Sequence, residues 1–148
     1  MRTTFLLFIL TAFISSSYNE FTPSEKTPVT IKITNIRSKS GSLRFGIYRN
    51  QSEFENEKPH FIKSVPKTNM KNGTVEFEMP LEEGYNGLAL LDDENNNTVM
   101  DYGILLPNEG FGFSNYVHSG LTRPKFDAFK FYVKSSVKTA VTVKVKYM

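Results

Sequence analysis

A period of two in the apolar residues marks several short segments of the chain. In residues 29–34, VTIKIT, apolar side chains alternate with Thr and Lys, and the same alternation recurs in residues 43–47, 75–79 and 141–147. Such a period places one set of side chains on a buried face and the other in water, which predicts half-buried β-strands. The side chains expected inside are Val29, Ile31, Ile33, Leu43, Phe45, Ile47, Val75, Phe77, Met79, Val141, Val143, Val145 and Tyr147.

The remaining segments complete an all-β pattern without a long amphipathic helix. Residues 85–91 are apolar on both faces, which is typical of a central strand, and residues 61–65 predict a short strand. Asn-Gly at 72–73 is a strong turn signal, and the short connection at 38–41 favours an antiparallel hairpin between the first two strands. Residues 50–60 predict a loop with a helical turn. We expect an antiparallel Greek-key β-sandwich of about seven strands, similar to an immunoglobulin domain.

The N-terminal residues have the three parts of a secretory signal peptide. Arg2 supplies the positive charge, residues 5–14 are apolar, and serines at 15–17 supply small residues for cleavage. A ten-residue apolar run is too short to span a membrane. We therefore predict a signal peptide at 1–17, a flexible lead-in at 18–27 and one β-sandwich domain at 28–148. The expected location is the periplasm or the extracellular space.

Composition narrows the possible chemistry. The 148-residue chain has no cysteine, which excludes disulfides, thiolate metal sites and a cysteine nucleophile. Its net charge is only +3 and its basic residues are scattered, so no nucleic-acid-binding surface is expected. No second apolar run reaches membrane length, and we expect no membrane span in the mature chain. The expected partner is an unidentified extracytoplasmic ligand or protein.

A polar loop near the middle of the chain carries the candidate site. Asp93, Asn95 and Asn97 occupy alternate positions, and Asp101 follows four residues later. Ca²⁺ prefers six to eight oxygen ligands from a loop that curls around it. The spacing resembles the first nine positions of an EF-hand loop, in which the residue at position seven, here Val99, offers its backbone carbonyl. A solvated Asx-rich turn is the structural alternative.

Two positions of the loop depart from the EF-hand pattern. Thr98 stands where Gly normally permits a sharp turn, and Ile104 stands where a bidentate Glu is expected. A ligand from outside the nine residues would have to complete the shell, and Glu109 is the nearest downstream carboxylate. Asn97 adopts a left-handed conformation more readily than Thr98 and is expected to make the turn. The weakened pattern predicts a low-affinity Ca²⁺ site.

Aromatic residues follow this loop and define a candidate ligand or partner surface. They are Tyr102, Phe111, Phe113 and Tyr116. Gly-Phe alternation at 110–113 also fits a strand, and core packing is the favoured explanation for the phenylalanines. Glycines beside them would still permit close approach of a ligand.

An extracytoplasmic hydrolase is the alternative function. Its parts would be the carboxylates of Asp92, Asp93 and Glu109, with His118 as base and Ser114 or Ser119 as nucleophile. A serine triad requires these groups within mutual reach, and no G-x-S-x-G motif occurs in the chain. Two histidines and no cysteine make a catalytic zinc site an unfavourable interpretation. We therefore expect a binding or structural module rather than an enzyme.

Two motifs carry a family resemblance. D-E-N-x-N-x-x-x-D at 93–101 and E-G-F-G-F-S-N at 109–115, together with the alternating strands, resemble the DUF2141 family of bacterial secreted proteins. The resemblance implies a prealbumin-like β-sandwich in the periplasm or outside the cell, and it implies no enzymatic activity. Members commonly carry His where this chain has Asp92 and Gly where it has Thr98. Loss of the imidazole favours a hard cation over zinc.

Overall fold

The computed structural model describes residues 26–104, 106–120 and 122–148. The expected signal peptide and nearly all of the expected lead-in lie outside the described residues. The described residues form eight strands and two short helices. The strands are β1 (Lys26–Thr34), β2 (Ser42–Tyr48), β3 (Phe61–Pro66), β4 (Val75–Glu82), β5 (Gly84–Asp93), β6 (Gly110–Phe113), β7 (Lys130–Val133) and β8 (Thr139–Lys144).

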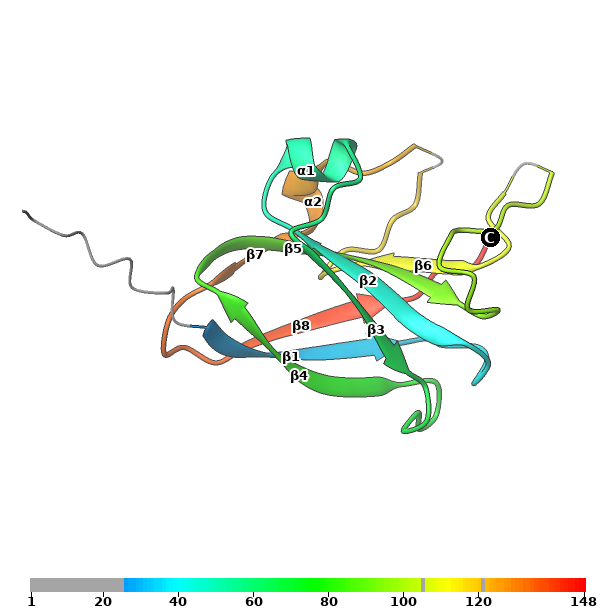
Figure 1. The fold of residues 1–148 in the computed structure, drawn as a ribbon, viewed down its shortest axis with the longest axis horizontal. Coiled ribbons are helices and arrows are strands. Elements are labelled where there is room, and N and C mark those ends of the chain that lie inside the picture. Colours follow the sequence, from blue (N-terminus) through cyan, green and yellow to red (C-terminus); the bar gives the residue numbers. More distant parts are fainter. Residues whose placement is uncertain (1–25, 105, 121) are drawn as a thin grey trace, which may run out of the picture.

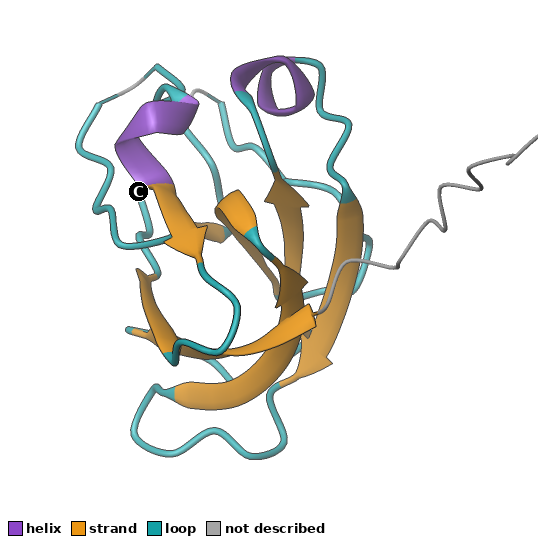
Figure 2. Cartoon of the chain, turned by 90° about the vertical axis from the view of Figure 1, so that its left-hand side faces the viewer, coloured by secondary structure: helices purple, strands orange, loops and turns teal. Residues whose placement is uncertain are grey.

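The strands form two facing sheets, which confirms the expected β-sandwich (Figure 1). One sheet has three strands in the order β4-β1-β8. The other sheet has five strands. Four of them lie side by side in the order β3-β2-β5-β6, and β7 also pairs with β5. All pairings are antiparallel except β1 with β8, which is parallel. The two layers and their connecting loops are seen from the side in Figure 2.

The core between the sheets follows the alternation in the sequence. Val29, Ile31 and Ile33 of β1 are buried, and so are Leu43, Phe45 and Ile47 of β2. The valines at 141, 143 and 145 are buried in the same cluster. Phe77 and Tyr147, both expected inside, are only half-buried at the margin of the core, where the Phe77 ring stacks on Phe45 with centroids 5.6 Å apart.

The predicted hairpin between the first two strands is wrong. Strand β1 lies in one sheet and β2 in the other, because both edges of β1 are already paired with β4 and β8. The connection at 35–41 therefore crosses between the layers. Asn35 and Gly41 take left-handed φ values of 63° and 70°, and a Cβ at residue 41 would collide with the backbone around Asp93. Only glycine allows this close passage.

Two short helices cover the outer face of the five-stranded sheet (Figure 1). They are α1 (Gln51–Glu55) and α2 (Phe126–Phe129). Asn50 caps α1 by accepting the Glu53 backbone N–H at 2.8 Å. A second aromatic cluster lies beneath them, formed by Phe54, Phe113, Phe126 and Phe129. Strand β5 is thus apolar on both faces, as its sequence predicts, with Leu88 and Leu90 in the main core and Ala89 against the aromatic cluster.

The tight turn at 72–73 is confirmed. Asn72 and Gly73 both have positive φ, and Lys71 and Thr74 exchange backbone hydrogen bonds of 2.9 Å. This is the geometry of a two-residue hairpin turn. Among the described residues, no helix has the length and apolar character needed to cross a membrane.

Candidate functional site

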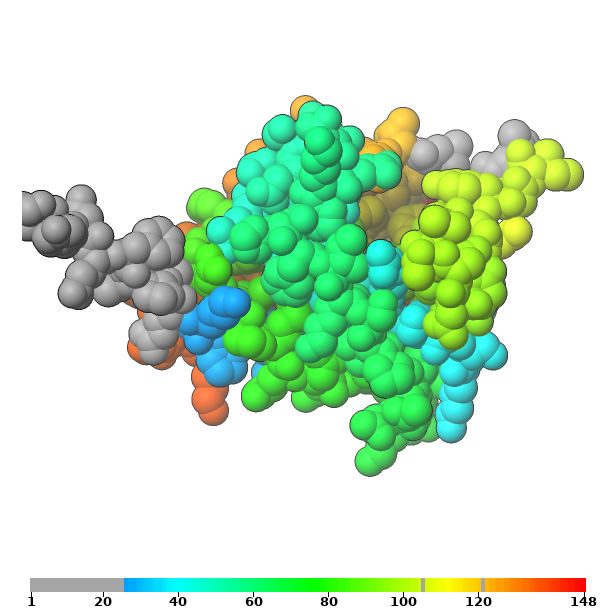
Figure 3. Space-filling view, viewed as in Figure 1, coloured from blue at the N-terminus to red at the C-terminus, as the bar shows by residue number. Residues whose placement is uncertain are grey.

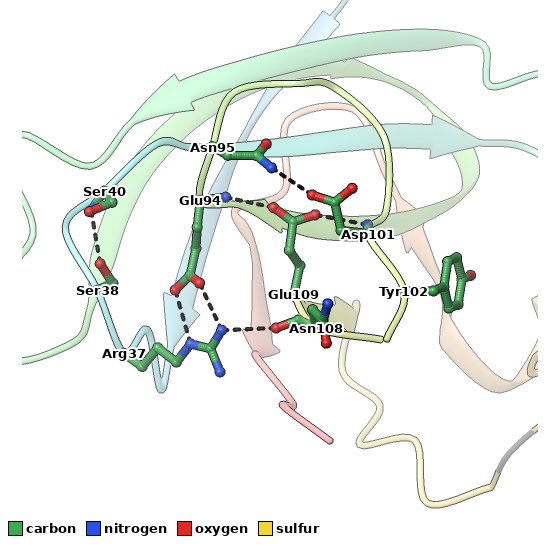
Figure 4. Close-up of a pocket in the computed structure, with 9 residues that line it drawn as sticks. All are labelled: Arg37, Ser38, Ser40, Glu94, Asn95, Asp101, Tyr102, Asn108 and Glu109. Atoms are coloured by element: carbon green, nitrogen blue, oxygen red, sulfur yellow. Dashed lines mark hydrogen bonds and ion pairs between the residues drawn. The ribbon is translucent and has the colours of Figure 1, made fainter. Parts of the chain in front are cut away.

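The polar loop emerges from the C-terminal end of β5 and returns to the sheet as β6. It lies at one end of the sandwich, against the crossing segment around residue 40 (Figure 3). Between them is an open, polar pocket of about 800 Å³ (Figure 4). Its walls are formed by Arg37, Ser38, Ser40, Glu94, Asn95, Asp101, Tyr102, Asn108 and Glu109.

Asp93 holds the first half of the loop in a curl. It is the last residue of β5 and is buried, so its backbone is fixed by the sheet. One carboxylate oxygen accepts the backbone N–H of Asn97 at 3.1 Å, and the other accepts that of Thr98 at 2.9 Å. A carboxylate that accepts two backbone N–H groups fixes the start of the loop around a single point.

Asn95 and Asn97 continue the curl by Asx turns. The side-chain oxygen of Asn95 accepts the N–H of Asn97 at 3.0 Å, and that of Asn97 accepts the N–H of Val99 at 3.0 Å. Both amide nitrogens donate to Asp101, at 2.6 Å from Asn95 and 2.9 Å from Asn97. Asp101 is therefore the common partner of Asn95 and Asn97, and Asp93 joins them through the backbone N–H of Asn97.

The residues with left-handed φ in the loop are Asn96 and Thr98, not the expected Asn97. Asn96 has φ of 59° and Thr98 has φ of 70°, whereas Asn97 has no positive φ. The prediction that Asn97 makes the turn is wrong, because its N–H is directed to both Asp93 and Asn95. A β-branched residue in this region is strained, and the strain at Thr98 is compensated by its hydrogen bond to Asp93.

Glu109 joins the two ends of the loop. It is buried, and its carboxylate accepts the N–H of Glu94 at 2.9 Å and that of Asp101 at 3.2 Å (Figure 4). The structure thus places this carboxylate against the backbone N–H of Asp101. Both of its oxygens accept backbone N–H groups, so Glu109 stabilises the loop whether or not it also contacts an ion.

Any ion in this loop would depend on amide and carbonyl oxygens. In the part of the chain that the structure describes, no group of three or more His, Cys, Asp and Glu side chains is arranged to hold a metal. Asn amides can supply the difference, because a side-chain amide oxygen has two lone pairs and can accept a backbone N–H while it faces an ion. The oxygens of Asn95 and Asn97 each accept one backbone N–H at 3.0 Å, which leaves a second lone pair on each oxygen.

A buried ion pair lies beneath the loop, and sequence reasoning missed it. Lys67, just after β3, contacts Asp92, the residue before Asp93, and both side chains are 0% exposed. Asp92 also accepts the hydroxyl of Tyr147 at 2.5 Å. The available signal was the alternation of β5, since Asp92 continues the inward face of Leu88 and Leu90.

Arg37 connects this buried pair to the pocket. Its guanidinium lies 4.3 Å from the centre of the Tyr147 ring and forms two hydrogen bonds with Glu94, at 2.7 and 3.0 Å (Figure 4). A bidentate pair of this kind is geometrically specific. The hydrogen bond from Arg37 lowers the pKa of Glu94, and burial followed by the hydrogen bond to Asp92 raises the pKa of Tyr147. The phenol therefore stays protonated and available as a donor.

The four aromatic residues of the predicted surface occupy different environments. Tyr102 is 68% exposed and lines the pocket. Phe113 is buried in the second aromatic cluster, with Phe111 and Tyr116 half-buried against it. Core packing therefore explains Phe113, and Tyr102 is the member of the set that a partner could reach directly.

The hydrolase candidates are not assembled into a triad. Ser114 is fully buried; its hydroxyl donates to the Phe129 carbonyl at 2.5 Å and accepts the Leu88 N–H at 2.9 Å. His118 lies among aromatic rings, 6.0 Å from the centroid of Phe113, and its Nδ1 has no hydrogen-bond partner within the described residues. Ser119 is exposed. The hydroxyl of Ser114 thus serves the backbone of two neighbouring segments.

The fold and the loop define a class: a β-sandwich with an Asp- and Asn-rich loop at one end. The family model described as "Uncharacterized protein conserved in bacteria (DUF2141)" matches residues 31–141. The chain therefore belongs to DUF2141, as its motifs indicated. No curated protein and no solved structure matches the chain.

Proposed function

We propose that the protein is an exported, non-enzymatic binding or structural module whose 93–101 loop binds one Ca²⁺ ion. The ligands would be the side chains of Asp93, Asn95, Asn97 and Asp101 with the carbonyl of Val99, and Glu109 or water would complete the shell. Tyr102 and the half-buried Phe111 and Tyr116 would present the adjoining surface to a ligand or partner.

The observation that carries this proposal is the curl of the loop. Asp93 accepts two backbone N–H groups, and the next two alternate side chains accept two more within the loop. These bonds curl the loop, and the amides of Asn95 and Asn97 both donate to Asp101. A hard cation requires several oxygen ligands held close together, and backbone hydrogen bonds hold the oxygens of this loop close together.

The expected affinity is low. Asp93 and Asp101 are the only charged side chains among the four loop ligands, and ligand charge is one determinant of Ca²⁺ affinity. Thr98 adds strain at the tight turn. We expect a Kd on the order of 10⁻⁴ to 10⁻³ M, the range of extracellular modules. Mg²⁺ should bind more weakly, because its small octahedral shell fits an irregular loop poorly.

Calorimetry and thermal melting with Ca²⁺ test the site. Binding to the folded state alone stabilises it by mass action, by about 1.4 kcal/mol at a Ca²⁺ concentration ten times the Kd. The Tm should therefore rise with Ca²⁺ and respond less to Mg²⁺. An unchanged melting curve at about 10 mM Ca²⁺, ten times the weaker expected Kd, together with calorimetry that detects no heat, would contradict the proposal.

Matched loop variants locate the ion. Asp93→Asn and Asp101→Asn keep the side-chain shape and one of the two acceptor oxygens but remove the charge, and each should abolish the Ca²⁺ response while the sandwich stays folded. Asn96→Gly is the control, because Asn96 is exposed, left-handed and outside the proposed ligand set. It should keep the full response. Loss of the response in Asn96→Gly alone would indicate a loop effect rather than a ligand effect.

Export is tested separately by the sequence of the mature N-terminus. Charge, apolar run and small residues within 1–17 support cleavage by signal peptidase. N-terminal sequencing of protein recovered from the cell envelope or medium should begin at about residue 18, within a few positions. A chain that still begins at Met1 in that fraction would contradict export by a cleaved signal peptide.

A further inference from the structure

The contact between Lys67 and Asp92 is a lysine amine held against a carboxyl group inside the sandwich. Strand β2 lies between β3, which Lys67 follows, and β5, which carries Asp92. Leu43 of β2 is registered with Val65 on one side and Asp92 on the other. Lys67 follows Val65 by two residues, so its long side chain reaches past the end of β2 to Asp92. Both side chains are 0% exposed.

The polar groups around this pair are few and each has a defined direction. Lys67 Nζ donates to the Ser40 carbonyl at 2.6 Å and contacts Asp92 Oδ1. Asp92 Oδ2 accepts the Tyr147 hydroxyl at 2.5 Å. Asp92 Oδ1 itself has no hydrogen-bond partner among the described residues, although the amine lies in contact with it. The amine is therefore close to the carboxyl without forming a regular hydrogen bond to it.

We propose that Lys67 and Asp92 condense into an intramolecular amide, a covalent cross-link between the β3–β4 connection and the end of β5. The amide would need one acceptor for its remaining N–H and one donor for its carbonyl. Ser40 supplies that acceptor and Tyr147 supplies that donor. The oxygen lost in the condensation would be Oδ1, the oxygen that no hydrogen bond holds.

The condensation balances without a cofactor. A proton passes from the Lys67 ammonium to Asp92, leaving a neutral amine and a neutral carboxyl group whose total charge equals that of the ion pair. The amine lone pair attacks Cγ of Asp92 and forms the N–C bond. The C–Oδ1 bond then breaks, and Oδ1 leaves as water with the proton already transferred and one more from Nζ. Nothing is oxidised or reduced.

Tyr147 is placed to assist the attack. Its hydroxyl oxygen accepts the Arg37 backbone N–H at 3.0 Å, which leaves the phenol proton directed at Asp92 Oδ2. Negative charge develops on Oδ2 when the amine attacks, and a fixed donor in a dry site stabilises that charge. Burial of both reacting groups supplies proximity and excludes the water that would reverse the reaction.

The physical setting favours a neutral product. An ion pair taken wholly out of water bears a desolvation cost that its mutual attraction often fails to offset. An amide removes both charges and keeps both hydrogen bonds. The chain has no cysteine, so this cross-link would give an exported domain the loop closure that a disulfide gives elsewhere. It is independent of Ca²⁺, because neither Lys67 nor Asp92 belongs to the proposed ligand set.

Mass spectrometry of the folded protein, denatured and digested with trypsin, tests the bond. Trypsin should fail to cleave after Lys67, and residues 64–71 should be recovered joined to residues 72–125, with a mass lower than the sum of the two peptides by one water, about 18 Da. Fragmentation of this branched peptide should place the junction at Lys67 and Asp92.

Lys67→Arg is the matched control. It keeps a positive charge and hydrogen-bond donors but presents a guanidinium, which is a poor nucleophile, and neither it nor Asp92→Ala should yield a branched peptide. The digest of the unmodified protein decides the proposal even where a variant fails to fold. Recovery of separate, unmodified peptides 64–67 and 68–71 from that digest would show that trypsin cleaves after Lys67 and that no water has been lost. That result would overturn the proposal and leave an ordinary buried ion pair.

Discussion

The three-stranded sheet and the loop end of the molecule are stabilised in different ways. In the sheet β4-β1-β8, apolar residues at every second position bury one face, and burial at about 25 cal/mol per Å² supplies the stability. At the loop end, Asp93, Glu109 and Arg37 hold backbone and side chains by directed hydrogen bonds. The first region tolerates changes on its wet face, whereas the second depends on individual polar groups.

Two adjacent residues show the difference most directly. Asp92 and Asp93 end the same strand, and alternation sends their carboxylates to opposite faces. Asp92 enters the core and meets Lys67 and Tyr147, and Asp93 turns to the loop and accepts two backbone N–H groups. The same carboxylate thus serves the core at one position and the loop at the next.

Removing the buried amine should have the largest effect. Lys67→Met leaves Asp92 buried with neither a cation nor the proposed amide, and breaking a buried pair in this way costs about 3–5 kcal/mol. Urea unfolding measures the loss. The double variant Lys67→Met with Asp92→Leu leaves no charge in the core but also lacks the proposed cross-link, so it should recover only the part of the loss that comes from the unpaired carboxylate. A single variant as stable as the unmodified protein would mean that the pair is not buried in solution.

Replacing each of two stacked phenylalanines by alanine should lower the free energy of unfolding by different amounts. Phe45 is buried and Phe77 is half-buried, although their rings are in contact. Phe45→Ala should cost about 3–5 kcal/mol, the range for a buried phenylalanine, and Phe77→Ala about half of that. Glu76→Ala, on the wet face of β4, should cost less than about 0.5 kcal/mol in the same unfolding measurement.

Equal losses for Phe77→Ala and Phe45→Ala would show that Phe77 is as deeply packed as the alternation first suggested. A large loss for Glu76→Ala would instead indicate that β4 is shifted by one residue, since a one-residue shift exchanges the two faces.

The sequence predicts the regular strands well because their information is local. Val29, Ile31 and Ile33 alternate with polar residues, and nothing outside the segment is needed to assign the buried face. The partner of a strand is not local. The hairpin expected at 38–41 was wrong, because β1 pairs with β4 and β8, far away in the chain.

The candidate site also combines residues that local spacing predicts with residues that only the strand pairing brings in. Spacing alone gathered Asp93, Asn95, Asn97 and Asp101, and all four meet in the loop. Lys67 and Tyr147 could not be assigned to this end of the molecule, because they come from other elements and reach it only through the pairing of β3, β2 and β5.

Relieving the strain at Thr98 should stabilise the loop. Threonine at φ of 70° has an unfavourable conformation that glycine adopts freely, and the penalty is about 1–2 kcal/mol. Glycine loses more chain entropy on folding, by about 0.5–1 kcal/mol. Thr98→Gly should therefore gain roughly 0.5–1 kcal/mol in unfolding free energy and should strengthen the proposed Ca²⁺ binding. Thr98→Ala, which keeps the strain, is the control, and an equal gain from it would contradict this explanation.

The smallest expected effect concerns Arg37 and Glu94 at the rim of the pocket. The hydrogen bond from Arg37 lowers the pKa of Glu94 below its usual value near 4.5. A carboxylate whose pKa is lower in the folded protein stabilises it above the unfolded pKa, and this contribution is lost as the pH falls through the folded pKa. The pair is partly exposed, so at neutral pH it should contribute only about 0.2–1 kcal/mol.

Glu94→Gln removes the charge and keeps an acceptor for Arg37, so it isolates this contribution. The difference in unfolding free energy between the unmodified protein and Glu94→Gln should be largest near pH 7, shrink below about pH 4.5 and decrease in high salt. Arg37→Met should lose more than Glu94→Gln does, because it also removes the contact with the Tyr147 ring. A difference that persists unchanged under acid conditions would assign the effect to packing instead of charge.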